Sequence, residues 1–214
     1  MTSPTVQRRR RRRLLAVATA GLALCIGVSV TSLAAWQQSI TVAGSDGNGG
    51  FGSSLLKIEL SLDGGTTWTA ATVNANGSLN FGSNASLLTP GDTVYASVLL
   101  RAAAGSRGAD VTLQGGTVGS DALLGALTYG ARLGVLRADC NAASFPSAGQ
   151  VLVNAGSVLS AAAPTSFSVP TPTTTGQPGT AVGVCLAVSL PTGVPSALGG
   201  QTTSPLWRFD ATSR

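Results

Sequence analysis

The chain contains no histidine, and this absence narrows the chemistry that its side chains can perform. Histidine is the commonest general base, and the Ser-His-Asp and Cys-His nucleophilic arrangements both depend on it. Many zinc sites also use it as a ligand. The other candidates for chemistry are eight acidic residues and three cysteines. We therefore expect no catalytic residue, no metal ligand and no cofactor.

The acidic residues are scattered along the chain, and most of them stand beside a turn. A glycosidase needs two carboxyl groups about 5–10 Å apart in a cleft, and the sequence nominates no such pair. An acidic side chain next to a turn usually caps that turn. The residues are Asp46, Glu59, Asp63, Asp92, Asp110, Asp121, Asp139 and Asp210. We expect them to have structural roles, and we predict that the protein is not an enzyme.

Two of the three cysteines form an even pair. Cys25 lies in an apolar run near the start, which leaves Cys140 and Cys185 in the rest of the chain. In an oxidising compartment such a pair is normally a disulfide, and two buried free thiols are the alternative. Closing a loop of this length stabilises a fold by roughly 4 kcal/mol in the chain-entropy model.

The first 35 residues have the layout of a secretory signal. Six arginines (8–13) precede the apolar run LLAVATAGLALCIGV, and small residues follow it. Ser32-Leu33-Ala34 fits cleavage after Ala34, with cleavage after Ala35 as the near alternative. An uncleaved membrane anchor over residues 14–36 is also possible, because 23 residues can span a bilayer. The layout fits export through the general secretory route and through the twin-arginine route.

The basic character of the chain belongs to its N-terminus. Without the six consecutive arginines, seven Lys and Arg residues stand against eight Asp and Glu, although the whole chain carries +5. Nucleic-acid binding needs a basic stripe on the folded domain, and we expect none. The predicted location is therefore extracellular, either secreted or at the cell surface, with membrane contact only through the N-terminal segment.

From residue 36 to residue 214 the pattern predicts a single all-β domain. Apolar residues alternate with polar ones in several runs, and Gly, Pro and Asn clusters separate these runs, which is typical of an antiparallel β-sandwich. The runs cover residues 54–63, 66–73, 92–102, 126–137, 181–190 and 207–211. Asp63-Gly64-Gly65 predicts a hairpin turn, and residues 120–127 suit one short helical turn. The Thr/Pro-rich stretch 164–179 predicts a loop, which is also a possible glycosylation site.

In its order of segments the chain resembles the exported proteins with a SipW-type alternate signal, the TasA/camelysin-like proteins of Gram-positive bacteria. The basic start, the junction SLAAWQQS, and the segments LLKIELSLDGG, LTPGDTVYASVLLR, VCLAVSL and LGGQTTSPLWRFDATS carry the resemblance. It implies a jelly-roll-like β-sandwich after an N-terminal signal or anchor helix. It also implies cleavage by a dedicated signal peptidase after Ala35, although relatives often have Asp where Gln38 stands.

Some members of that group assemble into extracellular matrix fibres by lending an N-terminal strand to the next subunit. The resemblance makes Trp36 to Ala43 the candidate donated strand, with Trp36, Ile40 and Val42 on one side. A freed strand needs a sheet edge, either its own or a neighbour's. We therefore expect a non-catalytic cell-surface or matrix protein that self-associates or joins sibling subunits. A monomeric binding module or adhesin is the alternative.

Overall fold

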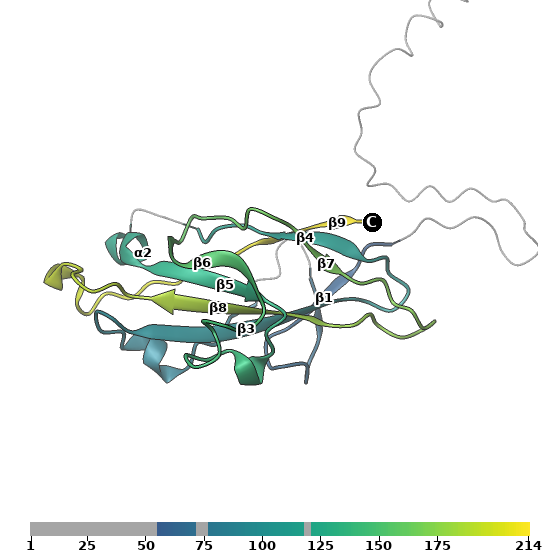
Figure 1. Ribbon diagram of the computed structural model, residues 1–214, viewed down its shortest axis with the longest axis horizontal. Coiled ribbons are helices and arrows are strands. Elements are labelled where there is room, and N and C mark those ends of the chain that lie inside the picture. The colour runs from purple at the N-terminus through teal and green to yellow at the C-terminus, as the bar shows by residue number, and fades with distance from the viewer. Residues whose placement is uncertain (1–54, 72–76, 118–120) are drawn as a thin grey trace, which may run out of the picture. The chain divides into compact units, whose positions relative to one another are not determined.

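Two antiparallel β-sheets make up the computed structural model, which describes residues 55–71, 77–117 and 121–214 (Figure 1). The larger sheet has six strands in the order β2-β1-β3-β8-β5-β6, and the smaller sheet has three in the order β7-β4-β9. The strands are β1 (Ile58–Ser61), β2 (Thr69–Ala70), β3 (Thr93–Ala102), β4 (Ala109–Leu113), β5 (Thr128–Leu133), β6 (Gln150–Val158), β7 (Phe167–Val169), β8 (Val182–Ser189) and β9 (Phe209–Ser213). The prediction of an all-β fold is confirmed.

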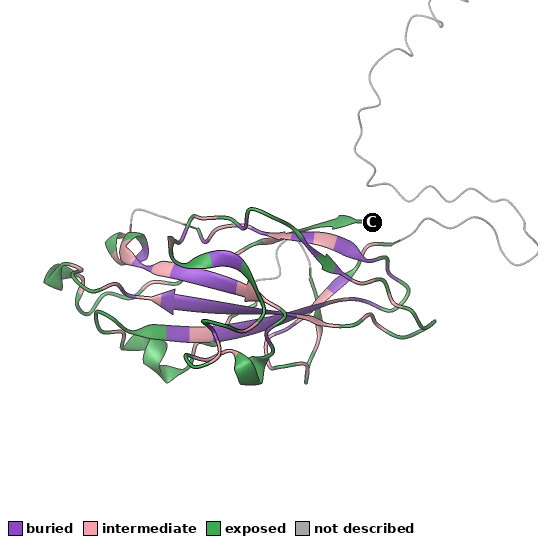
Figure 2. Cartoon of the chain, viewed as in Figure 1, coloured by how far each residue is buried: buried purple, intermediate pink, exposed green. Residues whose placement is uncertain are grey.

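The main hydrophobic core lies between the two sheets. Alternate residues of β3 and β8, such as Leu100 and Leu186, pack in one cluster with Val111 of β4 and Val169 of β7. Figure 2 shows the buried residues concentrated along β3, β8 and β5. Tyr129 of β5 is fully buried in this core, and its hydroxyl donates a hydrogen bond to the Ala161 carbonyl. The apolar residues that alternate along these strands in the sequence therefore point into the core, as predicted.

A second buried cluster covers the opposite face of the larger sheet. The segment between β5 and β6 folds back over β8 and β3, and its Val135 and Phe145 pack against Cys185 and Ala187. The Phe145 ring lies 5.6 Å from the Tyr95 ring, measured between centroids. Both faces of the central β3–β8 pair are consequently shielded from water, which suits the nearly continuous apolar sequence of β8.

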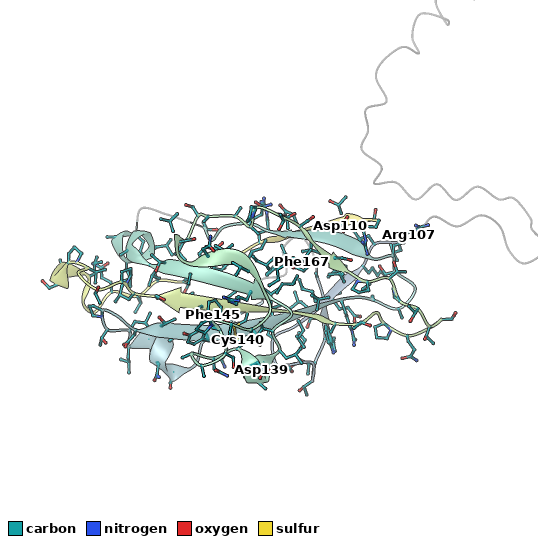
Figure 3. The ribbon with its side chains drawn as sticks, viewed as in Figure 1. Arg107, Asp110, Asp139, Cys140, Phe145 and Phe167 are labelled. Carbon is teal, nitrogen blue, oxygen red and sulfur yellow. A yellow bond between two sulfur atoms is a disulfide. The ribbon has the colours of Figure 1, made fainter. Side chains whose placement is uncertain are left out.

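The structure joins Cys140 to Cys185 in a disulfide, with 5.5 Å between the two Cα atoms. Cys185 is completely buried in β8, and Cys140 follows the 3₁₀ turn η2 (Arg137–Asp139) in the covering segment. Figure 3 shows Cys140 and Phe145 lying over the sheet near β8 and β3. The pairing predicted from the even number of cysteines past the apolar run is confirmed, and its structural effect is to fasten the covering segment to the central strand.

A glycine in β8 permits the close approach of this segment. The N–H of Gly134 donates to the Gly183 carbonyl at 2.7 Å, and a Cβ at Gly183 would collide with the Val135 carbonyl. A side chain at this position would lift the covering segment off the sheet. Glycine is therefore required here for backbone contact, whereas elsewhere in a central strand it would only weaken the sheet.

Three local features complete the comparison with the sequence. The predicted helical turn is α2 (Ala122–Ala126), whose first N–H groups are capped by the Asp121 carboxylate. The hairpin predicted at Asp63 joins β1 to β2, although β2 has only two residues. The Pro-rich stretch is not entirely a loop, because β7 forms within it as an edge strand with Phe167 and Val169 buried.

Replacing Gly183 by alanine is expected to destabilise the protein by about 1–3 kcal/mol, because the new methyl group must displace the covering segment. Gly125→Ala in α2 is the matched control. A Cβ at Gly125 meets no atom within 4 Å, and alanine is the better helix former, so stability should stay equal or rise by up to about 1 kcal/mol. Urea unfolding of both variants gives the comparison, and equal midpoints would contradict the close-packing argument.

Candidate functional site

One half of an edge of β3 has no strand partner among the described residues. Along one side β3 pairs with β8 from Thr93 to Leu100. Along the other side it pairs with β1 only from Leu99 to Ala102. The chain leaves this ladder after Ser61, so the first six residues of β3 remain uncovered on the β1 side.

The backbone groups at this open edge can be assigned from the ladder. The N–H of Ala103 donates to Lys57 beside β1, and the N–H of Leu190 donates to Asp92 beside β8. In an antiparallel ladder, alternate residues direct both backbone groups to the same neighbour. The backbone N–H and C=O groups of the odd-numbered residues of β3 therefore point to the side where β1 lies. Tyr95 and Ser97 each direct an N–H and a C=O toward the open part of this edge. Unpaired groups of this kind are the binding site for an added strand.

Two adjoining depressions follow this edge, with volumes of about 320 and 290 Å³. We call them together the β3 slot. Four parts of the chain line it: the first half of β3, residues 80–84, Leu62, and the disulfide wall, which we define as Arg137, Cys140 and Asn141. The residues common to both depressions are Phe81, Gly82, Tyr95 and Cys140. The slot thus runs along strand backbone that has no ladder partner among the described residues, unlike a closed pocket for a small molecule.

The side chains along the β3 side of the slot are held by the covering segment. Tyr95 stacks against Phe145, and burial raises the pKa of the Tyr95 hydroxyl above its usual value. This hydroxyl therefore stays neutral at physiological pH. Ser97 is only 8% exposed and stands opposite Cys185 in the β3–β8 register. Cys185 thus lies across β3 from the open edge, and its disulfide partner Cys140 lines the slot.

Exposed leucines accompany the segments that line the slot. Leu136 precedes the disulfide wall and is 54% exposed, and Leu87 follows the 3₁₀ turn η1 (Ser83–Ser86) and is 75% exposed. Both short helical turns lie on the same side of β3, below it in Figure 1. Large apolar side chains next to unpaired strand backbone are features of protein-binding surfaces more than of catalytic clefts.

The Asp63 turn explains why β1 ends early. The Asp63 carboxylate accepts hydrogen bonds from the N–H groups of Thr66 and Thr67 and from the hydroxyls of Thr67 and Ser61, at distances of 2.6–3.0 Å. The Thr67 hydroxyl and N–H, followed by the Ser61 hydroxyl, hold the pKa of this carboxyl well below its usual range. The turn is thus fixed by a charged group, and it directs the chain away from β3.

The Asp63 turn and the disulfide wall are linked. Arg137 donates a hydrogen bond from Nη1 to the Leu62 carbonyl at 2.9 Å, and its aliphatic stem lies against Gly64. Leu62 and Arg137 both line the slot. Two segments that are distant in the sequence are in this way brought to one end of the open edge.

The sequence-predicted site residues divide into two groups. Cys140 and Cys185 are joined, and Cys140 lines the slot. The signal (1–35), the cleavage positions Ala34 and Ala35, and the candidate donated strand with Trp36, Ile40 and Val42 lie outside the described residues. The slot itself was not predicted. A difference in length could have indicated it, because the run at 92–102 is longer than the part of the run at 54–63 that precedes the turn.

Comparison with known proteins identified no matching family model, no similar curated protein and no similar solved structure. Within residues 55–71, 77–117 and 121–214, no helix is long and apolar enough to cross a membrane. The same residues contain no group of three or more acidic or cysteine side chains placed to share a metal ion.

Asp63→Asn is expected to weaken the β1–β2 turn in a pH-dependent way. Because folding lowers the Asp63 pKa, the ionised carboxylate contributes stability above its unfolded pKa of about 4. This contribution is lost as the pH falls below that value toward the folded pKa. The difference in urea midpoint between wild type and variant should therefore be largest at neutral pH and should shrink below about pH 4.

The matched control is Asp210→Asn, which removes an exposed ion pair between Asp210 of β9 and Arg208, the residue before that strand, and should change the midpoint little. A midpoint difference for Asp63→Asn that does not vary with pH would contradict the role of the charge.

Proposed function

We propose that this protein is an exported, non-catalytic surface or matrix subunit that self-associates through the β3 slot. The observation that supports this best is the backbone of Tyr95 and Ser97, which lines a groove and has no strand partner within residues 55–71, 77–117 and 121–214. The occupant that we propose is the segment Trp36 to Ala43 of another copy, which is released when the signal is removed. Added beside β3, this segment continues the ladder from the point where β1 leaves it.

The segment has the composition of an added strand. Ile40 and Val42 alternate with Ser39 and Thr41, so that Trp36, Ile40 and Val42 fall on one side of the pleat. Burying these three side chains stabilises the complex by very roughly 4–8 kcal/mol before ordering entropy is subtracted. Backbone hydrogen bonds to the open edge add specificity for an extended chain.

The proposal includes the route by which the segment becomes free. Signal peptidase cuts after Ala35, as in the TasA/camelysin-like proteins that the sequence resembles, and Trp36 becomes the first residue outside the cell. The cut separates this segment from the signal and leaves it available to pair with a sheet edge. A jelly-roll arrangement is the form of sandwich that we propose once this strand is in place, with sibling matrix subunits as further partners.

A monomeric surface module is the second candidate. It follows if the segment 36–43 of each chain fills the slot of that same chain, which leaves no edge free for another copy. The exposed Leu87 and Leu136 beside the slot then form a binding surface for another protein. The two candidates differ in oligomeric state, so assembly of the mature protein distinguishes them.

The N-terminus of the extracellular protein tests the export step. N-terminal sequencing of protein from culture supernatant is expected to begin at Trp36, or at Ala35 if the alternative site is used. An intact chain that starts near Met1 and stays in the membrane fraction would show instead that residues 14–36 are an anchor.

A single backbone change tests whether assembly uses the β3 slot. Ser97→Pro removes an N–H that faces the open edge and leaves the β8 ladder intact, so the fold should survive. The lost hydrogen bond and the proline ring should raise the concentration needed for assembly at least about tenfold, measured by sedimentation. Deleting residues 36–43 should have the same effect from the side of the donor.

Ala96→Pro is the matched control, because its N–H faces β8. This variant should lose far-UV circular dichroism and unfold. Assembly of Ser97→Pro at the wild-type concentration would show that the slot is not the acceptor. Mature wild-type protein that remains monomeric at high concentration would favour the surface module.

A further inference from the structure

We propose that the Cys140–Cys185 disulfide regulates the β3 slot, so that the slot accepts a strand only in the oxidised protein. This inference rests on the proposed function, in which the slot receives an extended segment of another copy. Its structural basis is the position of the disulfide, which holds one side of the slot in place.

The disulfide joins the wall of the slot to the central strand β8. Cys185 is the register partner of Ser97, one of the residues that present backbone groups to the slot. Cys140 is one of only four residues common to both depressions. Directly facing residues on one side of an antiparallel pair have their Cβ atoms about 5 Å apart. The Sγ atom of Cys140 lies 3.3 Å from the Ala96 carbonyl oxygen, so the disulfide crosses the covered face of β8 and β3 and places Cys140 in the lining of the slot.

Apart from the packing of Cys140 itself against the second buried cluster and the Ala96 carbonyl, few contacts among the described residues fix the disulfide wall. None of the residues of η2 is buried. Its one side-chain hydrogen bond to the β1–β2 hairpin, from Arg137 to the Leu62 carbonyl, is exposed. The Asn141 side chain bonds only within its own loop, to Ala138, Ala143 and Ser144. An exposed hydrogen bond contributes about 1 kcal/mol, so the covalent link is the main constraint on the position of this wall.

The rest of the sandwich does not depend on the disulfide in the same way. The core between the two sheets contains neither cysteine. Val135 and Phe145, which flank the disulfide wall in sequence, are buried in the second cluster, on the opposite face of the larger sheet. Loss of the disulfide should therefore release the wall while the two sheets and the ends of the covering segment stay folded.

Formation of the Cys140–Cys185 disulfide connects the regulation of the slot to export. Cys140 and Cys185 form the bond by thiol–disulfide exchange with an oxidant that itself carries a disulfide, such as oxidised glutathione or a dithiol oxidoreductase. A thiolate attacks the oxidant, and the second thiolate displaces it from the mixed disulfide. The pair loses two electrons and two protons, and the oxidant becomes two thiols. Cytosolic thiols stay reduced, so the slot is completed only after export.

The experiment compares oxidised mature protein, the same protein reduced with excess dithiothreitol, and the Cys140→Ser/Cys185→Ser variant. Sedimentation measures assembly, and hydrogen exchange measures protection of residues 137–141 and of the strands. We expect the two bond-free forms to need at least a tenfold higher concentration to assemble. Exchange should rise at 137–141 and stay unchanged in β4 and β8. Re-oxidation of the reduced protein should restore assembly.

Each other outcome overturns the inference in a distinguishable way. Equal assembly of the oxidised protein and the double variant would show that the disulfide does not regulate the slot, while the proposed function stands. Loss of protection in β4 and β8 as well would show that the disulfide holds the whole fold. If the oxidised protein never assembles, both the proposed function and the regulation by the disulfide are contradicted.

Discussion

The antiparallel pairing of β3 with β8 is the interaction on which the rest of the structure depends. It extends over eight residues of each strand, from Thr93 opposite Ser189 to Leu100 opposite Val182. One face of the pair forms the core against the smaller sheet, and the other is covered by the segment that Cys140 and Cys185 fasten down. Burial on both faces explains why β8 is almost entirely apolar, and why Gly183 is needed where backbone lies on backbone.

A second constraint determines where this pair is left incomplete. The Asp63 carboxylate accepts hydrogen bonds from the hydroxyls and N–H groups around it, and in the turn that these bonds hold the chain leaves β3 after Ser61. β3 is therefore covered by β1 over only part of its length. Proteins normally protect open strand edges because these edges recruit other chains. Here the edge is recessed between residues 80–84 and the disulfide wall, which suits entry by a single extended segment.

The all-β class, the hairpin at Asp63, the helical turn at 120–127 and the cysteine pair could be predicted from the sequence. Each depends on residues close together in the chain or on simple counting. The β3 slot could not be predicted in this way, since it arises from the register between β1 and β3, whose paired residues are about forty positions apart.

At two places the structure differs from the local sequence pattern, and the causes are similar. Ser61 occupies a polar position in the alternating run at 54–63 but is buried, because its hydroxyl bonds to Asp63 and to the N–H of Gly65. β7 forms in a proline-rich stretch because its prolines flank Phe167–Val169 without interrupting it. In both places tertiary contacts override a local preference, as is common for strands.

The backbone amide hydrogens of Tyr95 and Ser97 report most directly on the claim that β3 has an open edge that an added strand fills. Hydrogen exchange with fragmentation that resolves single residues can follow both amides in monomeric and in assembled mature protein. The account predicts rapid exchange in the monomer and strong protection after assembly, while the Ala96 amide is protected in both states. Equal protection of Tyr95 and Ser97 in the monomer and in the assembly would contradict it.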